Sequence, residues 1–205
     1  TNIAAEEFKW TYNPPAPIIT ITSNDVANDG ITANKSINIT FTSNFPTNDF
    51  VTSDIDVTNG ELGILSGNSD NTVFTAMFTA TGDGIITIDV PSNVYTDTLY
   101  QRENIRSAQF NWRYDNIRPM MAITSSAVNN GASTAQSTIS LRFISSKPTS
   151  NFDINDLNIG NGRLLDFKFV STTEYTVNAQ SFFESNITSI NIAEGRYTDS
   201  VGNTN

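Results

Sequence analysis

The sequence predicts an all-β chain of two sandwiches in tandem, and three observations point to that fold class. Short runs alternate apolar and polar residues, as at Ile37, Ile39 and Phe41, which is the period of a half-buried strand. Turn-forming Asn, Asp and Gly residues separate these runs. The same order of runs and turns occurs twice in the 205 residues.

The duplication has an offset of 102 residues. An aromatic pattern of the form Phe-x-Trp-x-Tyr stands at residues 8–12 and again at residues 110–114. Other matches at this offset are residues 17–23 with 119–125, 37–41 with 139–143, 59–60 with 161–162, and 95–97 with 197–199. So many matches at one offset indicate a repeated structural unit.

Each copy is expected to hold about seven strands in roughly 100 residues and no helix, which is typical of an immunoglobulin-like sandwich. Proline-containing linkers at residues 13–17 and 115–119 mark the joints, because proline favours extended backbone. We therefore divide the chain into an N-terminal strand (residues 1–12), a first Ig-like domain (13–114) and a second Ig-like domain (115–205).

Charge and composition exclude several classes of function. The 11 Lys and Arg residues face 21 Asp and Glu residues, a net charge of −10, which disfavours nucleic acid and anionic membrane surfaces as partners. No apolar run is long enough for membrane insertion by a helix. Without Cys or His, catalysis would depend on carboxylates such as Asp54 and Asp56, and the second copy has Asn158 in place of Asp56. We expect no enzyme activity.

The motifs Trp-x-Tyr-Asp, Ile-Thr-Ser, Asn-Gly, Tyr-Thr-Asp and Gly-Asn-x-Asn together resemble the bacterial Ig-like tandem repeats of large surface adhesins and extracellular filaments. The first copy departs from the last motif, because residues 100–104 read Tyr-Gln-Arg-Glu-Asn. The resemblance covers the whole chain. It implies an extracellular or cell-surface location and a stalk-like role, in some families with calcium between domains.

The repeat is out of phase with the chain. The second copy runs to Asn205 without its last strand, whereas a copy of that strand stands at residues 1–12. One hypothesis is an excerpt from a longer array. The other is strand donation, in which Phe8, Trp10 and Tyr12 complete the second domain of another subunit and join the chain to itself head to tail.

Three kinds of ligand site are also expected. Oxygen-rich side chains near the repeat ends suggest calcium, with local turn capping as the alternative; they are Asp97, Glu103, Asp115, Asp199 and Asn203. Glycosylation sequons start at Asn34, Asn38 and Asn186, and the alternative is coincidence in a chain rich in Asn and Thr. Aromatic residues in expected loops, which would serve a carbohydrate-binding module, are Phe45, Tyr100, Phe182 and Phe183. The sequence thus predicts a structural filament subunit, with an adhesin stalk segment or a carbohydrate-binding Ig-like module as alternatives.

Overall fold

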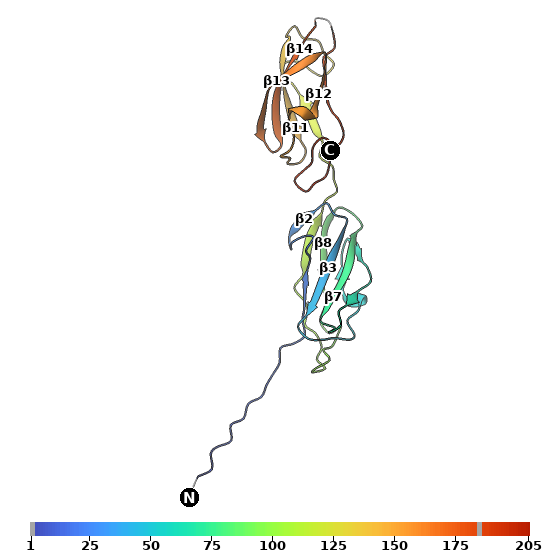
Figure 1. Ribbon diagram of the computed structural model, residues 1–205, viewed down its shortest axis with the longest axis vertical. Helices are drawn as coiled ribbons and strands as arrows, with labels where there is room; N and C mark the ends of the chain where they lie inside the picture. The colour runs from blue at the N-terminus through green and yellow to red at the C-terminus, as the bar shows by residue number, and fades with distance from the viewer. Residues whose placement is uncertain (1–2, 184–185) are drawn as a thin grey trace. The chain divides into compact units, whose positions relative to one another are not determined.

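The computed structural model describes residues 3–183 and 186–205, and strands dominate both parts of the chain (Figure 1). The only helical turns in these residues are two short 3-10 segments, η1 (Thr52–Asp54) and η2 (Ile154–Asp156). The chain divides into two compact units, Thr1–Gly30 with Lys35–Arg113, and Ile31–Asn34 with Tyr114–Asn205. The predicted all-β, Ig-like fold class is confirmed.

The first unit is built on two sheets. In one, the strand order is β1 (Ile19–Thr22), β3 (Ser36–Ser43), β7 (Val73–Ala80) and β5 (Gly60–Leu62), and β6 (Ser66–Gly67) also pairs with β7. In the other, the order is β2 (Gly30–Thr32), β9 (Phe110–Tyr114), β8 (Gly84–Asp89) and β4 (Asp56–Val57).

The core of the first unit follows from the alternation of its strands. Every second residue of β3 is buried, and Ile39 and Phe41 are fully enclosed. The ring of Phe50 lies 5.2–5.9 Å from three other buried rings, those of Phe41, Phe74 and Tyr95. These edge-to-face contacts are the arrangement that aromatic quadrupoles favour.

The second unit repeats most of this architecture. One sheet has the order β10 (Met121–Thr124), β11 (Thr138–Ser145), β14 (Glu174–Ser181) and β13 (Gly162–Ser171), and the other pairs β12 (Leu157–Gly160) with β15 (Ser189–Ile192). The core centres on Phe143, Phe152, Tyr175 and Tyr197. Within residues 115–183 and 186–205, no strand takes the place that β9 has in the first unit.

Candidate functional site

The free edge of β15 is the main difference between the two units. In the first unit β8 lies between β4 and β9, whereas β15 has only β12 beside it among the described residues. Val57 pairs with Ile88 in the first unit and Ile159 pairs with Ile190 in the second, so β8 and β15 are equivalent strands. Ile88 is fully buried but Ile190 is only half-buried. The open edge therefore leaves apolar surface of this sheet partly uncovered.

The N-terminal segment carries aromatic residues that nothing in the described chain covers. Phe8, Trp10 and Tyr12 are 84%, 77% and 67% exposed, whereas the matching residues of β9 are all below 7% exposed. The predicted strand over residues 1–12 is not found: residues 3–12 form no strand, and residues 1–2 lie outside the described residues. The physical reason is that a strand needs a sheet edge to pair with.

The loop that follows β15 is closed by a backbone hydrogen bond equivalent to one in the loop that follows β8. In the first unit, Asn93 N–H donates to Asn104 O, and Ser107 N–H donates to Val90 O, so the chain turns back antiparallel towards β9. In the second unit, Gly195 N–H donates to Asn205 O at the place of the first of these bonds. The hairpin geometry is therefore shared by both units as far as Asn205.

Asn104 and Asn205 hold these hairpins through their side chains. The Oδ1 of Asn104 accepts from the N–H groups of Val94 and Tyr95, and its Nδ2 donates to Pro91 O. Asn205 makes the matching bonds. The first copy therefore departs from the Gly-Asn-x-Asn motif at its first two positions, which are Gln101 and Arg102, but keeps the final asparagine as Asn104.

The loop of the first unit has one extra residue, which hid this match. Gln101 and Gly202 both have positive φ, at 55° and 97°, and are the equivalent positions. Tyr100, which a constant offset pairs with Gly202, lies in the longer loop instead. The second copy uses glycine where the backbone is left-handed, whereas the first copy places a glutamine there at some conformational cost.

A buried carboxylate anchors the segment that enters the first unit. Asp97 is fully buried, and its carboxylate accepts from the N–H groups of Leu99, Tyr100 and Arg102. The Arg102 guanidinium bonds Asp97 at 3.2 Å and donates to the carbonyl oxygens of Pro14 and Pro15. Burial raises the pKa of Asp97, but these hydrogen bonds and the charge of Arg102 outweigh it, so the pKa lies below its usual value.

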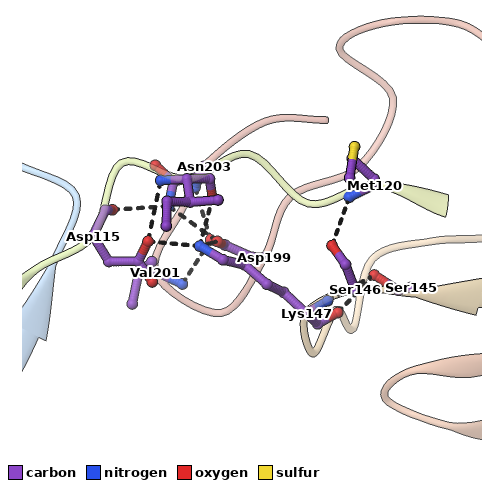
Figure 2. Close-up of polar contacts among 9 residues, drawn as sticks. Asp115, Met120, Ser145, Ser146, Lys147, Asp199, Val201 and Asn203 are labelled. Carbon is purple, nitrogen blue, oxygen red and sulfur yellow. Dashed lines mark hydrogen bonds and ion pairs between the residues drawn. The ribbon is translucent and has the colours of Figure 1, made fainter. Parts of the chain in front are cut away.

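In the second unit a lysine, Lys147, bonds the buried carboxylate and the linker in place of an arginine (Figure 2). The Lys147 ammonium contacts Asp115 at 2.7 Å and Asp199 at 3.0 Å, and it also donates to the carbonyl of Ile117. Asn203 Nδ2 donates to the carbonyl of Asp115 and to Asp199 Oδ2. Burial raises the pKa of Asp199, but the bonds from Asn203 and Lys147 lower it by more.

The cation that pairs with the buried carboxylate, Arg102 in the first unit and Lys147 in the second, comes from a different position in each repeat. Phe45 precedes Lys147 by 102 residues, and in the first unit its ring lies against the Arg102 guanidinium, 5.1 Å from the ring centroid. In the second unit the cation stands at this position instead. Sequence reasoning missed Arg102 and Lys147, although the repeated Asp97 and Asp199 could have prompted a search for a partner cation.

Four of the five residues expected to bind calcium thus lie in two separate clusters, each with a cation of the chain. Glu103 is not in either carboxylate cluster and lies in an isolated bridge with Thr96. Among the described residues, no group of three or more acidic side chains is arranged to hold a metal ion. Turn capping and linker anchoring account for the contacts of Asp97, Asp115, Asp199 and Asn203, and calcium binding stays a prediction.

The other predicted sites are dispersed. The sequon residues Asn34, Asn38 and Asn186 are exposed, which leaves them accessible to modification. The ring of Tyr100 lies over Arg102, 4.7 Å from the guanidinium carbon, together with Phe45. Phe182 and Phe183 are exposed neighbours in another loop. Asp54 accepts a hydrogen bond from Val51 N–H and so closes the η1 turn.

These two-layer antiparallel units define the chain as a protein of Ig-like β-sandwiches. Residues 14–110 match the family model described as a bacterial Ig-like domain. The first unit is therefore similar to bacterial Ig-like domains, and the 102-residue repeat relates the second unit to the first.

Similar solved structures include invasin, a bacterial integrin-binding protein, with 14% identity and a TM-score of 0.38 over 84% of this chain and 35% of that one. They also include domains 1–6 of the surface layer protein SbsC (9% identity, TM-score 0.35, 93% and 33% covered) and InvD of Yersinia pseudotuberculosis (13%, 0.29, 92% and 71%). The chain spans 33–41% of the length of the invasin and SbsC chains. No curated protein sequence matches it. No helix of the described residues could cross a membrane.

Proposed function

We propose that this chain is a structural subunit of an extracellular filament, in which the N-terminal segment of one copy completes the second domain of the next. One observation carries the proposal: among the described residues β15 has no strand in the place that β9 takes beside β8, and the exposed residues 8–12 repeat the sequence pattern of β9. Residues 8–12 would then be a strand only in the assembled state.

The energetics favour such a contact. A buried aromatic side chain removes about 150–250 Å² from water, so the three exposed aromatic residues supply on the order of 10 kcal/mol before ordering costs. The free edge of β15 also offers unpaired backbone groups, and native proteins seldom leave such an edge uncovered. Both partners of the contact are therefore incomplete alone.

The location and role follow from the same reasoning. The match to a bacterial Ig-like family and the acidic composition support an extracellular or cell-surface place for the chain. The sandwich cores and the anchored linkers would bear load rather than perform chemistry. The proposed partner is a second copy of this chain, and no enzymatic step is involved.

The test compares three full-length chains by negative-stain electron microscopy and light scattering. The variant F8S/W10S/Y12S removes the apolar face of the segment. The matched control K9S/T11S changes the opposite face of the same segment. Fibres from the wild type and the control, with discrete particles from the aromatic variant, are expected. Discrete particles from all three at every concentration would rule out the filament.

A stalk segment of a long multi-repeat adhesin is the second candidate. The linker anchors favour it, because Arg102 and Lys147 fix the residues that enter each domain, as an uninterrupted array of domains would require. In that case the following segment of a longer polypeptide would fill the β15 edge. A wild-type chain that stays discrete, but whose β15 edge is protected from hydrogen exchange once a further repeat is added, would favour this candidate.

A further inference from the structure

We propose that residues 3–12 are matched to the second domain of another copy and mismatched to the first, so that assembly has a fixed order. This inference rests on the proposed function. It concerns three side-chain positions. In the first domain they hold a buried acid, a cation and an amide, whereas in the second domain and the N-terminal segment they hold an amide, an alanine and an acid.

In the first domain the strand that follows β8 neutralises a buried acid. Asp89 is the last residue of β8 and is 4% exposed. A guanidinium nitrogen of Arg106, which precedes β9, lies 2.5 Å from Asp89 Oδ2 as an ion pair, although the contact does not have the geometry of a hydrogen bond. Gln109 Nε2 lies 3.5 Å from the other carboxylate oxygen. The segment that leads into β9 therefore brings a cation and an amide donor to a carboxylate.

In the second domain and the N-terminal segment these residues change together. The 102-residue offset places Asn191 at the position of Asp89, Ala4 at that of Arg106 and Glu7 at that of Gln109. The register agrees, because Asp56 pairs with Asp89 and Asn158 with Asn191. The acid has become an amide, the cation has been lost, and the amide donor has become a carboxylate acceptor for the Asn191 side chain.

This exchange gives the segment a preferred acceptor. On the first domain, Ala4 would leave the Asp89 carboxylate buried without a cation, and Glu7 would add a second negative charge beside it. On the second domain Ala4 would face the neutral Asn191 instead of a carboxylate, so no cation is needed there. Because an uncompensated buried charge is strongly destabilising, the segment cannot replace β9 and is directed to β15. The resulting contact joins unlike surfaces, which is the requirement for an open polymer.

The acceptor can be tested without polymerisation. The full-length F8S/W10S/Y12S chain keeps both domains but lacks a competing donor. A fluorescent peptide of residues 3–13 is titrated into it and followed by anisotropy. Acceptor versions carry N191D or the control S140D, which adds the same charge at an exposed position of β11 in the other sheet. Asn191 is exposed in the unoccupied domain, so N191D should leave folding intact.

The expected results form a double-mutant cycle. The wild-type peptide binds the Asn191 acceptor, N191D weakens binding by about tenfold or more, and S140D changes it little. A peptide carrying A4R recovers most of the loss on the N191D acceptor. Equal binding to Asn191 and N191D acceptors, or no binding at all, overturns the inference. Peptide binding with this pattern but no fibres from the wild-type chain would instead overturn the filament and leave the acceptor site established.

A disulfide gives a second readout of the register. In the first domain Ser107 N–H donates to Val90 O and Ser107 Oγ accepts from Val90 N–H, so the two residues are neighbours. Their counterparts are Ala5, which can keep only the backbone bond, and Ile192. The chain has no cysteine, so the A5C and I192C variants carry one thiol each. Under mild oxidation their mixture should form the mixed dimer. A mixture of A5C and N191C should not form the mixed dimer, because the side chains of residues 191 and 192 point to opposite faces of β15. Equal yields from both mixtures would contradict the register.

Discussion

Replacing Lys147 with Met should be the most damaging polar substitution in the second unit. The ammonium is the shared cation of Asp115 and Asp199, and the three side chains are only 19%, 15% and 2% exposed. Removing one partner of a buried ion pair costs about 3–5 kcal/mol. Asp199 keeps its bonds from the N–H groups of Val201 and Asn203, so we expect the lower end, about 3 kcal/mol.

Scanning calorimetry measures this cost for each unit separately. A domain of this size loses about 4–8 °C of midpoint per kcal/mol, so the transition of the second unit should fall by roughly 12–24 °C. The transition of the first unit should not move. The control Arg142→Met removes the exposed pair with Glu174 and should change little. A shift for Lys147→Met as small as for Arg142→Met would refute the anchor as a source of stability.

Three further predictions follow from burial, charge and backbone. Trp112→Ala should cost about 3–5 kcal/mol in urea unfolding, because Trp112 is buried against Phe78, whereas Trp10→Ala should leave unfolding of the unassembled chain unchanged. The lowered pKa of Asp199 means that its contribution is full above about pH 3.9 and disappears as the pH falls through the lower folded value. The pKa of Lys147 is raised, so its contribution to stability is full below about pH 10.4 and is lost as the pH rises through the folded value. Calorimetry across the acid and alkaline ranges measures both pH dependences. A melting midpoint that stays flat below about pH 3.9 would contradict the prediction for Asp199. Gly202→Ala should cost about 1 kcal/mol, because φ is 97° there and no neighbour would meet the new methyl group; an unchanged urea midpoint would count against the left-handed turn.

The sequence was sufficient for the fold class because alternation and repetition are local signals. Ile37, Ile39 and Phe41 alternate with polar residues, and these three are buried on one face of β3. The offset of 102 residues also identified equivalent strands without coordinates. The same offset failed in the loop at Tyr100, because a single inserted residue shifts every later match by one position.

The candidate sites were predictable only in part. The aromatic pattern of residues 8–12 predicts a strand, yet residues 3–12 form none, because strand formation depends on a partner edge that lies elsewhere. The acidic residues near the repeat ends suggest calcium ligands. In the structure a cation of the chain pairs with these carboxylates instead. Arg102 comes from the same hairpin as Asp97, whereas Lys147 comes from a separate segment and pairs with Asp115. Such pairing depends on distances that sequence spacing does not encode.

The sequence by itself determined that this chain has Ig-like sandwiches, a duplicated order of strands, an acidic composition and one aromatic strand pattern in excess. These properties follow from periodicity, composition and repetition, which act over a few residues or are visible by comparing the two copies. Only the tertiary structure decided that nothing in the described residues covers Phe8, Trp10 and Tyr12, that Ile190 of β15 is only half-buried, and that Asp97 and Asp199 each hold a linker through a cation. The physical reason is that sheet edges, burial and ion pairs arise between segments that folding brings together from distant parts of the chain.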